Sequence, residues 1–472
     1  MRRNAPLARR AAPLACLALL AIAVPARAES SAIERLAAAL RLETISPADP
    51  ADFRGEPFLA LHRHLEESFP LVHERLEREI VSEYSLLYTW AGADAAAAPI
   101  LLTSHLDVVP VPEGTESSWE QPPFAGVVAD GYLWGRGTLD DKFGVLATLE
   151  AVERLLAAGF APTRTIHLAF GHDEEIGGEH GAGAITKRLE DQGVRFAWSL
   201  DEGMAVISGV FPSLSVPSAL IGVAEKGYLT IELTARADGG HSSMPPREGA
   251  IGRLARAVGR LEASPMPADM ETIAGRTLDA LAPHVDGVQG LVLRNRRLLG
   301  PVVERALSRK ATTDALLRTT TAVTMVRAGV KENILPRSAT ATVNFRLLPG
   351  DTVEEVLEHV RQVVDDPEIE ITAGTGNPAS EVASTGSEGY ADLVAAIGAV
   401  YPDAVVAPGL VLGGTDSRHY GRIADDAYRF APLDLDIADS ARIHGVNERI
   451  GVENYARCID FYEALIRESA GP

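Results

Sequence analysis

The sequence predicts an α/β protein whose mostly parallel sheet is covered by helices and interrupted by a smaller inserted α+β domain. Two patterns support this prediction. Between residues 31 and 217, short apolar runs typical of buried strands alternate with helical stretches, and this alternation returns after residue 381. Between residues 223 and 372 the order of strands and helices is different. At 472 residues the chain is long enough for two domains.

The two outer regions supply the main sheet and its helices. Their strand-like runs are apolar throughout, as expected for parallel strands buried beneath helices, and turn residues bound them. The first region is predicted to contain strands at 99–104, 165–170 and 196–200 and a helix at 143–158. The last region is predicted to contain a helix at 390–400, strands at 405–412 and 426–433, and a closing amphipathic helix at 452–466.

The middle region has the order β-α-β-β-α-β, which is that of the ferredoxin-like fold. Residues 227–235 alternate as a half-buried strand does, with Leu229, Ile231 and Leu233 on one face. The other strands are predicted at 321–328, 339–347 and 369–372, and the helices at 251–261 and 353–364. A further helical segment, 265–320, exceeds what this fold needs.

The N terminus has the features of a secretory signal peptide. Arg2, Arg3, Arg9 and Arg10 form a positive region, an apolar stretch covers 11–24, and Ala26-Arg27-Ala28 matches a small-x-small cleavage site. We expect cleavage after Ala28, export to the periplasm or the medium, and no stable membrane span afterwards. The predicted division is a signal peptide at 1–28, a main domain built from 29–220 and 376–472, and an inserted domain at 221–375 that includes 265–320.

The composition excludes some partners and some chemistry. The chain has 44 Lys and Arg against 65 Asp and Glu, a formal charge of −21, and so acidic a protein repels nucleic acid. Cys458 is the only cysteine left after signal cleavage, so an internal disulfide and a cysteine-based metal site are both excluded. Because carboxylates are abundant, only clusters of them are informative.

Metal-binding side chains follow the three predicted strands of the first region, where open parallel sheets bind ligands. His105 and Asp107 lie two apart and point the same way, which suits an imidazole ligand oriented by a carboxylate. A structural histidine beside a turn-capping aspartate is the alternative. Glu174 and Glu175 are adjacent, and such a pair is costly to bury unless a cation is near. One would bind metal and the other would act as general base. Asp201 follows the third strand.

Two further segments complete the candidate site. The glycine-rich loop 135–142 opens a helix and contains Asp140; its acids exclude a phosphate-binding role, and a helix N-cap is the alternative to a metal site. His444 is followed by Asn447 and Glu448. A cysteine-free set of histidines and carboxylates favours zinc, cobalt or manganese.

Five ordered motifs resemble those of a known family. They are SHLDVVP at 104–110, GRGTLDDK at 135–142, DEE at 173–175, GHSS at 240–243 and IHGVNE at 443–448. They resemble the di-zinc family of aminoacylase, glutamate carboxypeptidase and succinyl-diaminopimelate desuccinylase over nearly the whole mature chain. Residues 317–322, 329–333 and 413–420 resemble its carboxypeptidase S branch, which includes a secreted N-fatty-acyl-amino-acid synthase/hydrolase.

The resemblance implies two zinc ions, replaceable by cobalt or manganese, and a role for each matched residue. His105 and Asp201 would bind one ion, Glu175 and His444 the other, and Asp140 would bridge them. Glu202 adjoins Asp201, and the family uses either acid type at this position. Glu174 would be the general base, Asp107 would orient His105, and His241 would donate a hydrogen bond to the substrate carbonyl. Asn333, Arg346 and Arg418 would hold the substrate carboxylate. We hypothesise that the inserted domain closes as a lid, from its own chain or from a partner in a homodimer formed through this domain.

These roles predict a hydrolase for the amide bond of N-acyl amino acids, with a fatty acyl group favoured and synthesis as the reverse reaction. A carboxypeptidase or dipeptidase acting on small peptides is the alternative, whereas an aminopeptidase fits less well because Asn333, Arg346 and Arg418 suit a carboxylate. A non-catalytic, exported metal- or ligand-binding protein would not need Glu174. Segment 265–320 either lines an acyl channel or thickens the core of the inserted domain.

Overall fold

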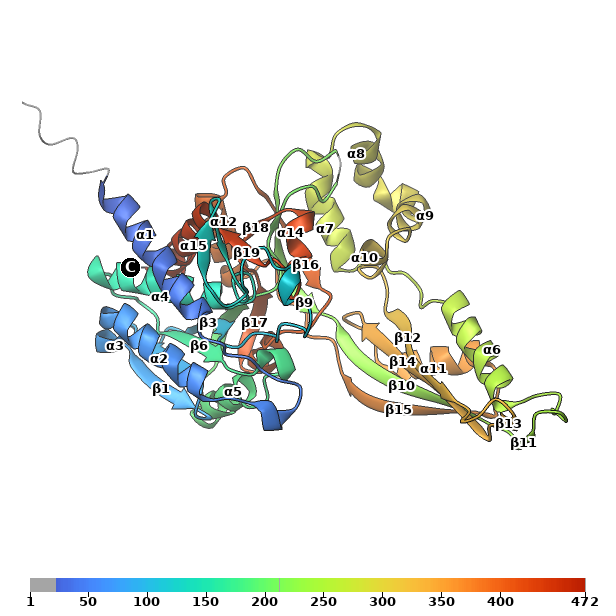
Figure 1. Cartoon of the computed structure of the whole chain (residues 1–472). Helices are drawn as coiled ribbons and strands as arrows, with labels where there is room; N and C mark the ends of the chain where they lie inside the picture. Colours follow the sequence, from blue (N-terminus) through green and yellow to red (C-terminus); the bar gives the residue numbers. More distant parts are fainter. Residues whose placement is uncertain (1–22, 212, 472) are drawn as a thin grey trace, which may run out of the picture.

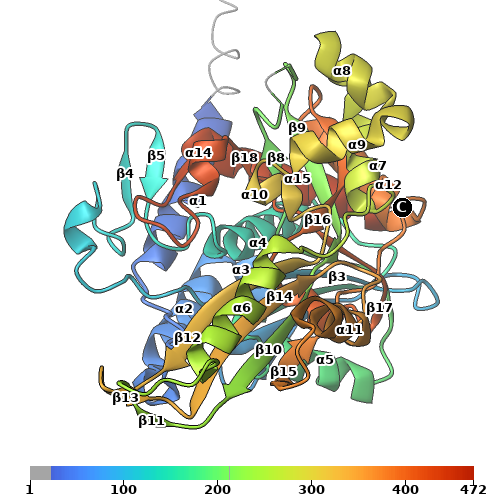
Figure 2. The same cartoon turned by 90° about the vertical axis from the view of Figure 1, so that its right-hand side faces the viewer.

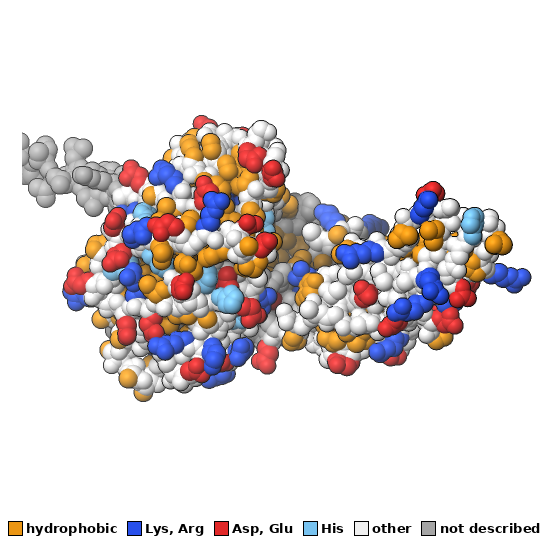
Figure 3. Space-filling model, turned by 60° about the horizontal axis from the view of Figure 1, so that its bottom comes forward, with side chains coloured by type: hydrophobic (Ala, Val, Ile, Leu, Met, Phe, Trp, Pro, Cys, Tyr) orange, Lys and Arg blue, Asp and Glu red, His pale blue; other side chains and the backbone are white. Residues whose placement is uncertain are grey.

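The computed structural model describes residues 23–211 and 213–471. The chain forms two lobes joined by a narrow waist (Figures 1 and 3), a main domain around a ten-stranded sheet and a smaller inserted domain around a four-stranded sheet. The predicted signal peptide lies mostly outside the described residues; its last six residues begin helix α1 (Ala23–Leu40). Within the described part of the chain, no helix is both long enough and apolar enough to cross a membrane.

The main sheet is mostly parallel, as predicted. Its strand order is β1-β2-β6-β3-β7-β17-β9-β8-β18, with β16 paired to β9. Parallel ladders join β3 (Ile100–His105) to β6 (Ile166–Gly171) and β7 (Phe196–Asp201), and β7 to β17 (Ala424–Arg429). All residues of β3 and β6 are buried, which explains their continuous apolar sequence. The remaining strands are β1 (Glu77–Val81), β2 (Ser85–Trp90), β8 (Val206–Ile207), β9 (Ser218–Glu225), β16 (Val405–Val411) and β18 (Asp434–Leu435).

Helices cover both faces of this sheet (Figure 1). Leu101 and Leu102 are neighbours on β3, and their side chains belong to different apolar clusters, one on each face. The Leu102 cluster includes Leu149 of α4, and the Leu101 cluster includes Ile185 of α5 (Ala182–Asp191). The helices of the first layer are α1, α4 (Lys142–Ala157), α12 (Glu388–Val400) and α15 (Val452–Ala470).

The inserted domain has the predicted ferredoxin-like topology. Its strand order is β12-β14-β10-β15, and all three ladders are antiparallel. Leu254 of one helix and Val360 of the other are buried against the sheet. Strand β12 is at the edge of the sheet, and most of its residues are exposed. The elements are β10 (Gly227–Arg236), α6 (Ala250–Ala263), β12 (Thr320–Ala328), β14 (Ser338–Leu347), α11 (Val353–Val364) and β15 (Ile369–Asn377).

The sequence places the helical segment 265–320 in the inserted domain, but the structure shows it against the main domain. It packs on the main domain, where α7 lies against β16 and Thr277 Oγ1 donates to the Pro408 carbonyl at 2.6 Å. Leu278 and Leu281 share an apolar cluster with Leu220 of β9. The core of the inserted domain is already closed by α6 and α11, so this segment buries its apolar side on the main domain instead. Its helices are α7 (Ile273–Leu281), α8 (Gly287–Arg294), α9 (Arg296–Leu307) and α10 (Ala311–Asp314).

Candidate metal centre and substrate cleft

Four of the five predicted metal ligands meet at the carboxyl edge of the main sheet. Asp140 lies between two histidines, with Oδ1 2.8 Å from His105 Nε2 and Oδ2 2.9 Å from His444 Nε2. Glu175 Oε2 is 3.2 Å from His444 Nε2. Asp140 is thus placed so that each of its oxygens faces one histidine, which is the geometry that a bridging carboxylate requires.

Asp107 is fully buried and joins two parts of this cluster. Its Oδ1 is 3.3 Å from His105 Nδ1, on the ring edge opposite Asp140. The same carboxylate accepts hydrogen bonds from the backbone N–H groups of Glu174 and Glu175, each at 3.2 Å. One side chain therefore fixes both the ring of His105 and the backbone that carries the two glutamates, as expected for a carboxylate that orients a metal ligand.

The third strand end differs from the expected ligand set. The Oδ1 atom of Asp201 accepts a hydrogen bond from Thr103 Oγ1 at 2.6 Å, whereas its buried Oδ2 has no hydrogen-bond partner among the described residues. Glu202, the next residue, places Oε1 3.5 Å from His105 Nε2. With His105 and Asp141, Glu202 forms a group whose ligand atoms all lie within 4.8 Å of one another. The geometry thus favours Glu202 over Asp201 as the ligand, since adjacent residues of a strand point in opposite directions.

The charges of the cluster are strongly coupled. Burial would lower the pKa of His105, but hydrogen bonds to Asp107, Asp140 and Glu202 raise this pKa well above its ordinary value. Hydrogen bonds to Asp140 and Glu175 raise the pKa of His444 to about 10. Several carboxylates thus draw positive charge onto both imidazoles, which is the electrostatic demand that divalent cations satisfy.

The residues fit a divalent metal. Among the buried polar atoms of the described residues, Glu175 Oε1 and both Asp141 carboxylate oxygens have no hydrogen-bond partner. His105, Asp140 and Glu175 form a second group whose ligand atoms lie within 4.8 Å of one another. Imidazole nitrogens and carboxylate oxygens without a thiolate are a donor set for zinc, cobalt or manganese.

A buried ion pair joins the loop of Asp140 to the loop of His444. Its two residues lie within the sequence motifs, but the sequence did not reveal this role. Arg136 Nη1 donates to Glu448 Oε2 at 2.5 Å, and both side chains are at most 1% exposed. Glu448 Oε1 accepts from the backbone N–H groups of Gly137 at 3.0 Å and Leu139 at 2.8 Å. Arg136 Nη2 donates to the carbonyl of His444, whose backbone adopts φ 59°, in the left-handed region. The pair therefore sets the distance between Asp140 and His444.

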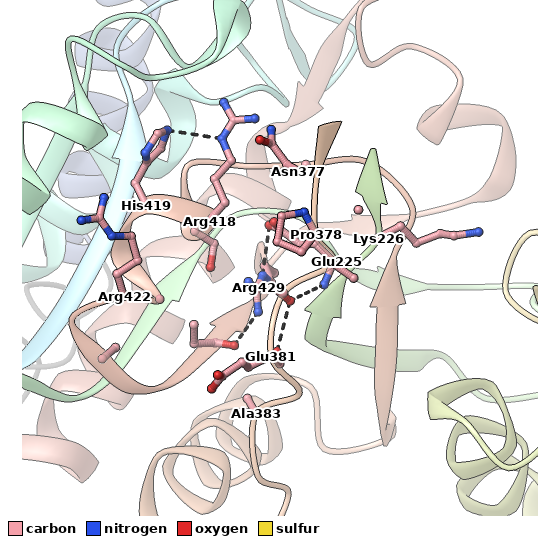
Figure 4. A pocket seen from close by; sticks show the side chains of 18 of the residues that line it. Glu225, Lys226, Asn377, Pro378, Glu381, Ala383, Arg418, His419, Arg422 and Arg429 are labelled. Atoms are coloured by element: carbon pink, nitrogen blue, oxygen red, sulfur yellow. Dashed lines mark hydrogen bonds and ion pairs between the residues drawn. The ribbon is translucent and has the colours of Figure 1, made fainter. Parts of the chain in front are cut away.

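A cleft of about 930 Å³ opens beside the metal ligands. It is lined by Glu174, Glu175 and His444 from the main domain and by Arg346 from β14. Arg418, on the short helix α13 (Ser417–Tyr420), lines the same cleft. Figure 4 shows Arg418 beside His419 on one wall, with Lys226 on another. The cleft thus connects the metal ligands with two predicted carboxylate-binding arginines.

Glu174 lines this cleft but, unlike Glu175, forms no ion pair with His444. Burial raises the pKa of Glu174 well above its ordinary value, and the charges of Glu202, Asp416 and Asp140 raise it further. The adjacent glutamates therefore differ in position as a general base and a metal ligand should.

Arg346 stacks over the ring of Tyr228 with its guanidinium carbon 5.1 Å from the ring centroid.

His241 and Asn333 do not reach the cleft. Both are exposed at the far tip of the inserted domain, where the short strands β11 (Gly240–His241) and β13 (Ile334–Leu335) pair (Figure 1). There Ser242 N–H donates to the Asn333 carbonyl at 3.2 Å. Arg346 marks the opposite end of β14, so at about 3.3 Å per residue the tip lies roughly 30 Å from the cleft. Within one chain in this conformation, the predicted oxyanion donor is separated from the metal ligands.

A parallel sheet with histidines and carboxylates at its carboxyl edge, joined to an inserted ferredoxin-like domain, is the architecture of a two-domain metallohydrolase. The model of Peptidase family M20/M25/M40 matches residues 101–468, and the chain belongs to this family. It is accordingly a metal-dependent enzyme that hydrolyses amide bonds.

The relatives include both peptidases and acyl-amino-acid hydrolases. The chain is 42% identical over 442 residues to a probable carboxypeptidase S-like 2 of Dictyostelium discoideum, an alignment covering 92% of this chain and 84% of the relative. It is 40% identical over 441 residues to the N-fatty-acyl-amino acid synthase/hydrolase PM20D1 of Xenopus tropicalis, covering 93% and 85%. Carboxypeptidase S of Saccharomyces cerevisiae is 33% identical over 493 residues, covering 93% and 84%.

Solved structures show the same fold. A metallo-carboxypeptidase of Sulfolobus solfataricus superposes with a TM-score of 0.65 at 20% identity, covering 93% of this chain and 99% of the other. Human carnosine dipeptidase 1 superposes with a TM-score of 0.62 at 16% identity, covering 98% and 100%. The predicted fold class and family are confirmed.

Proposed function

We propose that this enzyme hydrolyses the amide bond of N-acyl amino acids, favours fatty acyl groups, and catalyses the reverse condensation when both products are abundant. The observation that carries the proposal is the cleft in which Arg346 and Arg418 face the same space as Glu174 and His444. Two guanidinium groups suit the free carboxylate of an amino acid, because they bind carboxylates through charge-assisted hydrogen bonds. The fatty-acyl preference follows the relatives that carry that name.

We assign the metal ligands to His105, Asp140, Glu175, His444 and Glu202, with Asp201 as the alternative to Glu202. The proposed occupants are two zinc ions, for which cobalt or manganese could substitute. When bound, such ions supply Lewis acidity, lowering the pKa of an attacking water and polarising the substrate carbonyl. Asp107 keeps His105 in the tautomer that presents Nε2 to the ligand cluster.

The chain's own residues would carry the remaining steps. Glu174 takes a proton from water as the water oxygen attacks the amide carbon. The carbon–nitrogen bond then breaks, and Glu174 returns this proton to the leaving amine, so that a carboxylic acid and a free amino acid result. Arg346 and Arg418 hold the carboxylate of the amino acid and thereby place the amide beside Glu174.

His241 is proposed to act from a partner subunit. Its distance from the cleft of its own chain means that it must either travel with a large lid rotation or belong to a second copy. The free edge of β12 supports the second arrangement, because Met325 and Val326 are exposed there, at 42% and 63%. An exposed edge strand with apolar side chains is a ready surface for pairing with an identical strand. Asn333, at the same tip, would enter the partner's cleft with His241.

The second candidate function is a carboxypeptidase or dipeptidase for small peptides. The same arginines would bind the C-terminal carboxylate of a peptide, and the carboxypeptidase S relatives favour this substrate class. The pattern of residues 1–28 supports export to the periplasm or the medium under either function.

The two functions are separated by a series of substrates that share one amino acid. We would measure kcat/KM for N-acetyl-, N-octanoyl- and N-dodecanoyl-phenylalanine, below their micelle thresholds, beside an alanyl-phenylalanine dipeptide. Each methylene buried on binding contributes up to about 0.8 kcal/mol, roughly fourfold in affinity, so efficiency should rise with acyl length. A flat or falling series with a good dipeptide rate would reject the fatty-acyl proposal and leave the peptidase.

The helical segment 265–320 does not supply the acyl site at this cleft, because none of its described residues lines it. Most apolar side chains at the cleft come from other segments: Pro378, Ala379, Val382 and Ala383 follow β15, Tyr228 belongs to β10, and Ala424 and Ala427 belong to β17. The acyl chain is therefore proposed to lie along residues 378–383.

A further inference from the structure

The outermost part of the main domain is a pair of helices, α8 and α9, that carries an unpartnered apolar surface. Figures 1 and 2 show both helices projecting away from the sheet. On α8, Val288 is 78% exposed and Leu291 58%; on α9, Leu298 is 83% exposed and Val302 57%. Val288 and Leu291 are three residues apart and therefore share one side of α8. Helix α9 is kinked at Leu299, so Leu298 and Val302 are exposed on either side of the kink.

The opposite sides of these helices already have partners. Leu293 of α8 and Val303 of α9 are buried in the apolar cluster that attaches this segment to β9 and β16. The exposed apolar residues of α8 and α9 are therefore not needed to pack this segment on the main domain. A single exposed leucine is common on protein surfaces, but four large apolar side chains that are more than half exposed on two neighbouring helices are typical of an interaction surface.

The same segment reverses the charge of the protein. Residues 287–310 contain six cationic side chains and one carboxylate, in a chain whose net charge is −21. Charges beyond about 10 Å are screened at moderate salt, so a surface that meets this segment senses its local positive charge more than the net charge of the chain.

The charges that face inward are paired and those that face outward are free. Arg296 is 5% exposed and bound to Asp279 at 2.6 Å, while Glu304, the one carboxylate, is 3.7 Å from Arg318. The outward cations are Arg297, Arg305, Arg309 and Lys310, all exposed and without an ion pair among the residues that the structure describes. The sixth cation, Arg294, is exposed and donates to the carbonyls of Ala282 and Val285 at 3.0 and 3.3 Å. The outer surface of α8–α9 thus combines free cations with protruding valine and leucine side chains.

We propose that α8–α9 is a docking surface for an anionic phospholipid membrane. Cationic groups attract the lipid phosphates while apolar side chains enter the boundary between headgroups and acyl chains, and this combination distinguishes an interfacial helix from an ordinary surface helix. A symmetric dimer through the same surface is disfavoured, because it would bring two sets of unpaired cations together. The docking surface does not depend on which amide the cleft hydrolyses.

The position of the surface also connects it to the cleft. The chain leaves α9 through α10, and the carbonyls of Ala315 and Arg318 accept hydrogen bonds from Lys226 Nζ at 2.8 and 2.7 Å. Lys226 lines the cleft. Docking through α8–α9 would therefore hold the cleft close to a lipid surface, where amphiphilic compounds concentrate.

Sedimentation with vesicles tests the proposal on the full-length mature chain. Phosphatidylcholine vesicles are compared with vesicles of equimolar phosphatidylcholine and phosphatidylglycerol. Binding should be confined to the second and should weaken as salt rises. The double variant Arg297→Glu, Arg309→Glu should lose at least roughly 25-fold in partition, since each cation near an anionic surface contributes about fivefold. Leu291→Ser with Leu298→Ser should lose on the order of tenfold or more.

Matched controls separate docking from general charge and stickiness. Arg54→Glu reverses an exposed cation elsewhere on the main domain that has no ion pair among the described residues, and Val330→Ser removes a side chain that is 91% exposed on the inserted domain. Both variants should bind vesicles as the parent does. Equal binding to both vesicles, or equal loss in these controls, would overturn the proposal. The proposal would also be overturned if the protein bound neither kind of vesicle, whether or not it formed a dimer in solution through Leu291 and Leu298.

Discussion

Arg136 and Glu448 form a buried ion pair, at 2.5 Å, that connects the loop of Asp140 to the loop of His444. Neither side chain faces the cleft, so their effect on the site is exerted through the two ligands that they hold. This arrangement explains why two loops that are about three hundred residues apart in sequence present their side chains to one point.

Replacing Arg136 with methionine is expected to weaken metal binding. The variant leaves the Glu448 carboxylate buried without its partner, which costs about 3–5 kcal/mol of stability, and loosens the His444 loop. A loss of about 10–100-fold in metal affinity is expected. Isothermal titration with zinc measures it, and Arg63→Met, at an exposed ion pair with Glu56 outside the cleft, is the control. If Arg136→Met folds and binds metal as the parent does, the pair does not position the ligands.

Glu202 and Asp201 are expected to respond differently to loss of charge. Glu202→Gln should reduce the metal bound per chain, because its carboxylate lies 3.5 Å from His105, whereas Asp201→Asn should retain metal, because Asp201 binds Thr103 and forms no ion pair with His105. Metal analysis of the dialysed, folded proteins measures the difference. The reverse result, metal lost from Asp201→Asn and kept by Glu202→Gln, would restore the ligand set that the sequence predicts.

His167 is expected to make stability fall in acid. Burial lowers the pKa of His167 to about 4, whereas an unfolded histidine titrates near 6.5. Between these pH values the unfolded chain binds a proton that the folded chain does not, so stability decreases as pH falls from about 6.5 to 4, by up to about 1.4 kcal/mol per pH unit. Urea unfolding of His167→Gln across this range should show a shallower slope, and His284→Gln, at an exposed position, should not. Identical slopes of stability against pH for the parent and for His167→Gln would contradict this account of His167.

His241 is expected to complement a neighbouring subunit. His241→Ala and Glu174→Gln should each be nearly inactive, and a mixture allowed to exchange subunits should regain activity, because one cleft in the mixed dimer then has both residues intact. The measurement is hydrolysis before and after mixing, with subunit exchange followed by energy transfer between labelled chains. Exchange without recovered activity would place His241 in its own chain's cleft.

Much of the fold was predictable because the pattern of apolar residues is strong. The ferredoxin-like order was correct, since its strands alternate and its helices are amphipathic. Strand β9 (Ser218–Glu225) has no counterpart among the predicted elements, because its Gly and Ala residues weaken the strand signal. The predicted strand 426–433 is shorter in the structure, because β17 ends at Arg429 and residues 430–433 belong to no strand. Segment 265–320 shows the limit of local patterns, which mark an apolar helix face but not the surface that covers it.

The site was predictable in its residue types more than in its geometry. His105, Asp107, Asp140, Glu175 and His444 stand out in sequence because they follow strands or lie in ordered motifs, and the structure brings all five together. The choice between Asp201 and Glu202 depends on which side of a strand end each residue faces, and adjacent acids leave that open. The separation of His241 from the cleft depends on how two domains are arranged, which no local pattern encodes.

The central claim is that a metal cluster and Glu174 together hydrolyse an amide, and Glu174→Gln tests it most directly. The substitution keeps size and removes the proton acceptor, while Glu175, His105 and the other ligands are unchanged. Steady-state hydrolysis of N-dodecanoyl-phenylalanine is measured on protein whose metal content has been determined. The account predicts normal metal content and a kcat lower by about 10²-fold or more. Near-normal turnover at full metal content would contradict it.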